Sequence, residues 1–148
     1  MLRIAKINNM LVPKKVKYRK WHVMRRNPKR VGVASRGTEV SFGQYGLKAT
    51  TAHRIRSNQL EAARKAVSKA VGKTGKVWIR IFPDMPYTQK PAEVKMGKGK
   101  GDIQGYHVEV WPGRVIFEVD GVTKEVAHEA LRKGGTKLPV KTKVVERH

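Results

Sequence analysis

The strongest constraint on the fold of this chain is the positive charge at its N-terminal end. Residues 1–38 contain twelve Lys or Arg side chains and no Asp or Glu, the first carboxylate being that of Glu39. Like charges at this density repel one another, and Pro13 and Pro28 interrupt any helix or strand. We therefore expect residues 1–38 to form a basic arm whose order depends on a polyanion, the alternative being a disordered solubilising tail.

The net charge of the whole chain points to the same kind of partner. Its 148 residues include 33 Lys or Arg and 11 Asp or Glu, which gives a formal net charge of +22. Self-repulsion destabilises a compact globule with this charge, so a polyanion is expected to bind it. Nucleic acid is the usual polyanion, because each neutralised phosphate releases condensed counterions, and an acidic membrane surface is the lesser alternative.

The hydrophobic content allows one folded unit. At 39% hydrophobic residues the chain can bury one ordinary core, so we expect a single α+β domain at residues 39–148. The chain has no cysteine, which argues against disulfides, a thiolate nucleophile or a thiolate zinc site. No apolar run approaches the ~20 residues that span a bilayer, and the N-terminus lacks the apolar stretch of a secretory signal. We expect a soluble, cytoplasmic protein, although an acid-free, Arg-rich N-terminus is also typical of an organellar transit peptide.

Alternating apolar residues predict about five short strands. These lie at residues 39–43, 77–82, 106–110, 114–119 and 139–145. The strand at 77–82 has apolar residues on both faces, so we expect it to be central. Pro112-Gly113 supplies a turn, which makes 106–110 and 114–119 the two arms of an expected hairpin. The sheet is therefore expected to be mixed or antiparallel.

Two segments with helical spacing of apolar residues are expected to pack on that sheet. The first is capped at Ser57 or Asn58, with Glu61 at capping-box spacing from Asn58, and ends at Gly72. The second begins after Thr123 and ends at Gly134-Gly135. Helices laid against a sheet in this element order give an α+β fold.

A glycine-rich and lysine-rich run, Met96 to Gly101, is the most unusual local feature. Its glycines let backbone N–H groups approach an anion, and Lys98 and Lys100 add charge. The spacing does not match a nucleoside-triphosphate loop, which needs Gly-x-x-x-x-Gly-Lys-Ser/Thr. We interpret residues of about 84–105 as a mobile loop that contacts RNA, the alternative being a flexible surface turn.

Catalysis finds little support in the sequence. The histidines are scattered, at His22, His53, His107, His128 and His148. His128-Glu129 lacks the second histidine of a zinc-protease helix, and no serine lies in a Gly-x-Ser-x-Gly elbow. Acids such as Asp84, Asp102, Glu109 and Asp120 are explained by salt bridges to the surplus cations. We expect no catalytic residue, no metal site and no cofactor.

Several segments resemble the bacterial-type large-subunit ribosomal protein L-sixteen, whose wider family includes the archaeal and eukaryotic L-ten-e proteins. The longest are Val40-Ser41-Phe42-Gly43 with Gly46-Leu47-Lys48-Ala49, and Trp78-Ile79-Arg80-x-Phe82-Pro83-Asp84 with Pro86, Thr88 and Lys90-Pro91, followed by Met96 to Gly101. Shorter matches are Met10-Leu11-x-Pro13-Lys14, Lys17 to Lys20, Glu61 to Arg64 and Lys137-Leu138-Pro139. Together they cover about Met10 to Val145.

The resemblance implies an α/β-hammerhead type of fold docked on large-subunit (23S-type) RNA beside the aminoacyl-tRNA site. Such a protein is architectural: it acts late in subunit assembly, contacts tRNA near the peptidyl-transferase region and lies among neighbouring ribosomal proteins. Expected RNA-binding residues are Lys14, Lys15, Lys17, Arg19, Lys20, Arg25, Arg26, Lys29, Arg30, Arg36, Lys90, Lys95, Lys98 and Lys100. Expected tRNA-facing residues are Arg64, Lys65, Lys69, Met96 and Gly97.

Three departures from the family pattern stand out. Nine residues precede Met10, and they could be an extension, a transit segment or a start-site artefact. Lys95 occupies the position where some members carry a hydroxylated arginine, and Gly105-Tyr106-His107 replaces Glu-Tyr-Trp. Two other functions stay open, an RNA- or tRNA-binding module outside the ribosome and a small phosphate-handling enzyme that uses the glycine loop.

Overall fold

A computed structural model describes residues 11–23 and 31–148, and within them the chain forms two helices and seven strands. The strands are β1 (Tyr45–Ala49), β2 (His53–Arg56), β3 (Lys76–Ile79), β4 (Met85–Gln89), β5 (Asp102–Val110), β6 (Val115–Asp120) and β7 (Thr142–Glu146). The helices are α1 (Ser57–Val71) and α2 (Lys124–Gly135). The α+β fold class is confirmed.

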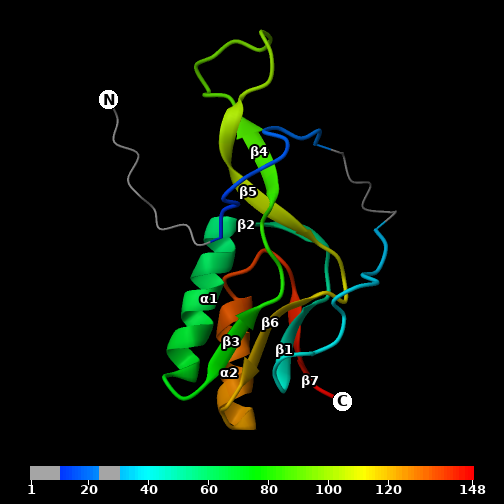
Figure 1. Cartoon of the computed structure of the whole chain (residues 1–148), viewed down its shortest axis with the longest axis vertical. Helices are drawn as coiled ribbons and strands as arrows, with labels where there is room; N and C mark the ends of the chain where they lie inside the picture. The colour runs from blue at the N-terminus through cyan, green and yellow to red at the C-terminus, as the bar shows by residue number, and fades with distance from the viewer. Residues whose placement is uncertain (1–10, 24–30) are drawn as a thin grey trace.

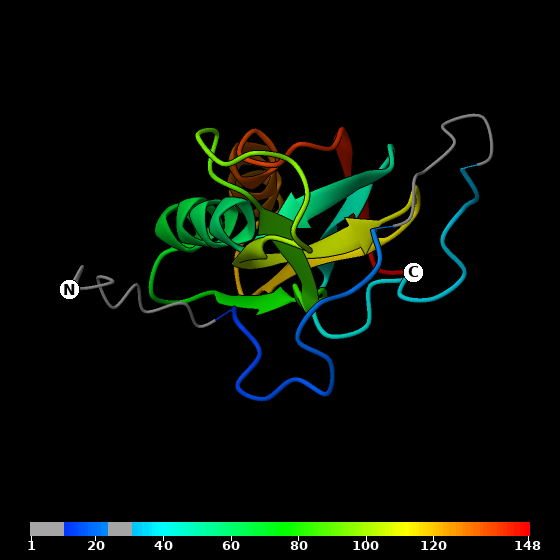
Figure 2. The ribbon, with the colours of Figure 1, turned by 90° about the horizontal axis from the view of Figure 1, so that it is seen from above.

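The strands form two separate antiparallel sheets. One has four strands in the order β3-β6-β1-β7, and the other has three in the order β2-β5-β4. Helices α1 and α2 lie side by side over one face of the four-stranded sheet (Figures 1 and 2). The β4–β5 hairpin extends away from them, and its loop forms the far end of the molecule (Figure 1).

The core lies between the two helices and the four-stranded sheet. Helix α1 contributes Leu60, Ala63 and Val67, all fully buried, at the spacing of one helical face. Gly134 of α2 lets the two helices approach closely, because a Cβ atom there would lie 2.3 Å from Val67 Cγ2. The predicted end of the second helix at Gly134-Gly135 is confirmed, and Gly134 in addition packs between the two helices.

The predicted C-terminal stop of α1 is confirmed, but its predicted start is wrong. Gly72 has φ 78°, and its N–H donates to the carbonyl of Ser68 at 3.0 Å. At the other end, the N–H of Arg56 donates to the side chain of Gln59 at 3.0 Å. Glu61 does not close a box with Asn58, because its carboxylate binds Arg64 instead.

The strand predicted at 39–43 is wrong, and the first strand begins at Tyr45. The backbone amides of Ser41, Phe42 and Gly43 donate to the carboxylate of Glu118 rather than to a neighbouring strand. The segment therefore crosses the face of the four-stranded sheet that the helices leave open.

The expected hairpin and the expected central strand are also wrong. A turn does follow Trp111, but β5 and β6 belong to different sheets, so the turn carries the chain from one sheet to the other. Strand β3 lies at an edge of its sheet. Strand β4 was not expected because it contains Pro86, which is tolerated since β4 is an edge strand too.

Parts of the predicted arm are held by the domain itself. Leu11 is buried and belongs to the core cluster. The N–H of Ala34 donates to Pro112 O at 2.9 Å, and Gly37 O accepts from the N–H of Val115 at 2.8 Å. Residues 31–38 are therefore anchored by protein contacts, which differs from the expectation that order in the arm depends on a polyanion alone.

Candidate nucleic-acid interface

The described cations of the arm are displayed to solvent. Lys14, Lys15, Lys17 and Arg19 are exposed, and Lys20 is partly buried. The cations Arg25, Arg26, Lys29 and Arg30 lie outside the described residues. Tyr18 is 63% exposed and Trp21 39% exposed, so neither aromatic ring anchors the arm to the core. Such rings remain accessible to bases or sugars.

The loop of the β4–β5 hairpin is the second basic element. Its irregular part covers residues 90–101, narrower than the 84–105 predicted, because β4 and β5 occupy the flanks. Every residue from Pro91 to Lys100 is exposed, and Met96 at the tip is 99% exposed. Gly97, Lys98 and Gly99 all have positive φ, of 107°, 59° and 94°. The two glycines adopt this left-handed conformation without steric cost, whereas Lys98 between them adopts it at a steric cost because it has a Cβ atom.

The arm and the loop are tied together by lysine side chains. Lys20 Nζ donates to the carbonyl of Lys100 at 3.3 Å, and Lys100 Nζ donates to the carbonyl of Trp21. Within the loop, Lys90 Nζ donates to the carbonyl of Gly97. These contacts bring cations of the two elements together into one basic surface. Figure 1 shows the arm running past the β4–β5 hairpin.

The predicted cationic face of α1 lies elsewhere on the molecule. Lys65 and Lys69 are exposed, but Arg64 is partly buried and donates to Glu61 at 3.0 Å. The Arg64 guanidinium lowers the pKa of Glu61, so both groups are charged and engaged with each other. Helix α1 lies beside α2 and β3, whereas Met96 and Gly97 belong to the loop between β4 and β5, which lies at the far end of the hairpin (Figure 1). The predicted tRNA-facing residues thus form two distinct surfaces.

Five Glu side chains form ion pairs with cations of the protein itself. The described ion pairs join Glu61 to Arg64, Glu109 to Arg54, Glu118 to Arg80, Glu129 to Arg132 and Glu146 to Lys124. Because five of the eleven acids are paired within the protein and Lys and Arg number 33, cations dominate the surface charge. This arrangement favours contact with phosphates.

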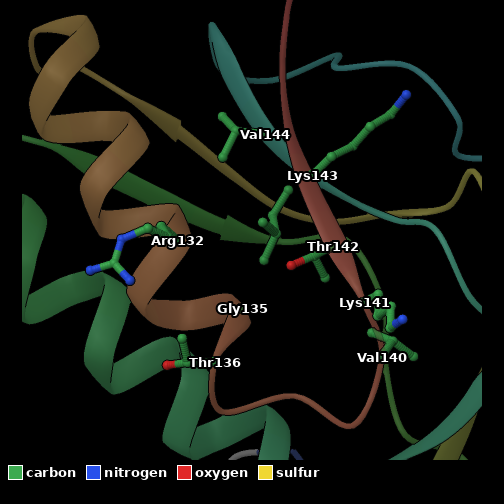
Figure 3. A pocket seen from close by; sticks show the side chains of 9 residues that line it. Arg132, Gly135, Thr136, Val140, Lys141, Thr142, Lys143 and Val144 are labelled. Carbon is green, nitrogen blue, oxygen red and sulfur yellow. The ribbon is translucent and has the colours of Figure 1, made fainter.

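An open groove of about 430 Å³ lies between the end of α2 and strand β7 (Figure 3). Arg132 on the helix, Lys143 on the strand and Lys141 just before the strand line the groove (Figure 3). Its lining includes no His, Asp or Glu, so it has no acid and base pair for catalysis. Among the described residues no group of three or more His, Asp or Glu could hold a metal ion. Neither helix in the described ranges is long and apolar enough to cross a membrane.

A model of the family described as "Ribosomal protein L16p/L10e" matches residues 13–145. The chain belongs to this family. The resemblance to the L-sixteen proteins is therefore confirmed, and the chain is a structural ribosomal protein rather than an enzyme.

Close relatives cover nearly the whole chain. The large ribosomal subunit protein uL16 of Thermosipho melanesiensis is 54% identical over 139 residues, which are 94% of this chain and 95% of the relative. The uL16 proteins of Macrococcus caseolyticus and Bartonella quintana are 55% and 51% identical, over 93% of this chain and over 93% and 98% of their own lengths.

Sequence reasoning missed the buried charge that organises the L16p/L10e domain. Glu118 is 0% exposed, lies in the middle of β6 and binds three backbone amides and Arg80. Burial alone would raise the pKa of its carboxyl, but the hydrogen bonds from Ser41, Gly43, Arg80 and Phe42 outweigh burial, and the pKa is lowered. A lone acid in the apolar run Val115 to Val119 was the available signal.

Proposed function

We propose that this L16p/L10e protein binds large-subunit RNA through its arm and the loop of its β4–β5 hairpin. The observation that carries the proposal is the lysine-tied basic surface that these two elements form. Its lysines reach carbonyl groups of the chain itself, and phosphate oxygens are stronger acceptors for the same donors. The names of the relatives, which are large ribosomal subunit proteins, support the large subunit as the place of action.

The finer role follows from the family resemblance. We infer that the protein lies beside the aminoacyl-tRNA site on a cytoplasmic large subunit, contacts tRNA and acts late in assembly among neighbouring ribosomal proteins. Met96 and Gly97, both exposed and carried on a hairpin that protrudes from the domain, support a long reach into RNA. In this proposal residues 1–38 are the arm and residues 39–148 the RNA-binding domain. Lysine contacts to phosphates add affinity, and the shape of the RNA sets the register.

Cosedimentation with large subunits tests the proposal. We expect the full chain to sediment with large subunits at moderate salt and to resist competition by unrelated RNA. A variant with Lys14, Lys15 and Lys17 changed to Gln should sediment less, because its phosphate contacts are lost. Changing Lys124, Arg132 and Lys133 on α2 to Gln removes the same number of exposed charges, is the matched control and should have little effect. Equal binding to unrelated RNA would favour an RNA-binding module outside the ribosome.

A further inference from the structure

Three planar side chains lie together on the face of the four-stranded sheet that the helices leave open. The ring centroids of Phe42 and Trp78 are 6.3 Å apart with planes inclined by 22°. The guanidinium carbon of Arg80 lies 5.0 Å from the Phe42 centroid. We call Phe42, Trp78 and Arg80 the planar stack. Phe42 is 56% exposed, so most of its ring contributes nothing to the core.

The register of the sheet explains why these groups meet. Trp78 of β3 lies directly opposite Glu118 of β6, and Glu118 lies opposite Gly46 of β1, so all three share one face. A Cβ atom on Gly46 would come within 2.7 Å of the Val40 side chain. The missing side chain at Gly46 therefore lets the segment before β1 lie flat on the sheet. That segment carries Phe42 to the side of Trp78.

Glu118 fixes the stack from beneath. Its buried carboxylate accepts the N–H groups of Ser41 at 3.1 Å, Phe42 at 2.6 Å and Gly43 at 2.9 Å, and it also binds Arg80. The backbone of Phe42 and the side chain of Arg80 are thus held by one acid. Side chains that are already held in place lose less conformational freedom when a flat ligand binds than mobile side chains would.

The charges around the stack decide what kind of ligand fits. Arg80 is neutralised by Glu118, so the stack offers flat surfaces rather than a cation for a phosphate. Further cations lie next to it, because the Arg114 guanidinium donates to Arg36 O at 3.1 Å and to Arg80 O at 3.4 Å. The side chain of Arg36 is exposed. Basic neighbours attract a polyanion, and the planar parts of a polyanionic RNA are its unpaired bases.

We propose that the planar stack receives an unpaired nucleobase of RNA, which stacks on the exposed ring of Phe42 and the partly buried ring of Trp78 while the RNA backbone runs past Arg36. The inference rests on the proposed RNA-binding function. It adds a site that contacts the flat face of a base instead of a phosphate. Stacking on aromatic rings tolerates any base, so the site adds affinity and position rather than sequence specificity.

A simpler role for Phe42 is to shield the Glu118–Arg80 ion pair from water. A leucine in its place would still shield the pair, but it would have no ring on which a base could stack. The substitution Phe42→Leu therefore separates the two roles, and Phe82→Leu is its matched control. Phe82 is 45% exposed and follows Arg80 by two residues, yet it is not part of the planar stack.

The experiment measures affinity of the full chain for two single-stranded probes of roughly 12 nucleotides, within the usual site range of such interfaces. One is an oligouridylate, and the other is an abasic ribose-phosphate strand of equal length and charge. We expect Phe42→Leu to bind the oligouridylate more weakly than the wild type does, and the double variant Phe42→Leu, Trp78→Leu to bind it about tenfold more weakly. Phe82→Leu should bind it like the wild type. Binding to the abasic strand and the salt dependence should not change. Unfolding by urea checks that the variants remain folded.

The outcomes separate the inference from the function on which it rests. If the wild type binds neither probe and does not sediment with large subunits, the proposed RNA-binding function fails and the inference fails with it. If it sediments with large subunits but binds neither probe, only the inference is overturned. If it binds both probes equally well, and the double variant behaves like the wild type, only the inference is overturned. Loss of incorporation into large subunits with unchanged binding to both probes would identify a protein partner and overturn it too. Ultraviolet crosslinking of RNA to the peptides that carry Phe42 or Trp78 in assembled subunits would support it directly.

Discussion

Two regions of this molecule hold charged side chains against backbone groups, and they do so in opposite ways. At β6 the buried Glu118 gathers three backbone amides and a guanidinium. In the loop of the β4–β5 hairpin, the partly buried Lys90 and the exposed Lys100 donate to backbone carbonyls. Removing a buried charge leaves unsatisfied groups inside the protein, whereas water replaces an exposed one. The first arrangement therefore stabilises the fold, and the second remains free to exchange its partners for phosphates.

The largest effect is expected when the buried acid is removed. Glu118→Ala leaves Arg80 and three amide groups without their common acceptor, so the free energy of unfolding should fall by about 3–5 kcal/mol. Urea denaturation of the purified chain measures this change. Glu129→Gln is the control, because its ion pair with Arg132 on α2 is exposed to solvent and should contribute little to stability. Equal losses for the two variants would erase the contrast between buried and exposed charge.

A second prediction concerns the base of the hairpin, where His107 is 4% exposed and packs on the Tyr87 ring at 5.5 Å. Burial, together with the positive charge of Arg54, lowers the pKa of His107 from 6.5. The unfolded chain therefore takes up this proton first, and stability present above about pH 6.5 is lost as the pH falls towards the folded-state pKa.

The lost stability should amount to no more than about 1.4 kcal/mol per pH unit, the linkage limit for one group. His107→Leu cannot take up the proton, so its free energy of unfolding should be flatter between pH 6.5 and the onset of carboxylate titration. Urea denaturation across that range compares the two proteins. His53→Leu, at the exposed start of β2, is the control and should keep the wild-type slope. A wild-type curve already flat in this range would contradict the prediction.

The contrast between the two regions also marks what the sequence could and could not predict. The existence of helix α1 and the residue at which it ends were predictable, because apolar spacing and a following glycine are local signals. The pairing of β5 and β6 with other strands was not, since a turn at Pro112-Gly113 looks the same whether it closes a hairpin or links two sheets. Strand β4 was missed because Pro86 normally argues against a strand.

The site divides in the same way. Exposed lysines in the loop were identified from composition alone, since charge and glycine are visible in sequence. The role of Glu118 depends on residues 75–77 positions away in the chain, which no local pattern reveals. For the same reason Phe42 was assigned to a strand, and its place beside Trp78 became evident only from the sheet register.

A third prediction addresses the exposed region. Changing Lys95, Lys98 and Lys100 to Gln should reduce the slope of log affinity against log salt for large-subunit RNA by roughly 2 to 3, because each neutralised phosphate contributes about 0.7 to 0.9. Stability should barely change, since all three side chains are exposed. Binding measured from low to moderate salt, with urea denaturation alongside, tests both halves. A large loss of stability would mean that the loop lysines support the fold, as Glu118 does.

The smallest effect is expected on α1, where the two kinds of charge meet. Replacing Arg64, Lys65 and Lys69 with Gln should weaken RNA binding similarly for all sequences and reduce the salt slope by roughly 1.4 to 1.8, which corresponds to two phosphates rather than three. Arg64 is discounted because it is already paired with Glu61. Arg64→Gln alone should therefore leave the slope almost unchanged, whereas Lys65→Gln should lower it. If Arg64→Gln lowers the slope as much as Lys65→Gln does, RNA competes successfully with Glu61 for Arg64. An ion pair within the protein would then not prevent a cation from binding phosphate.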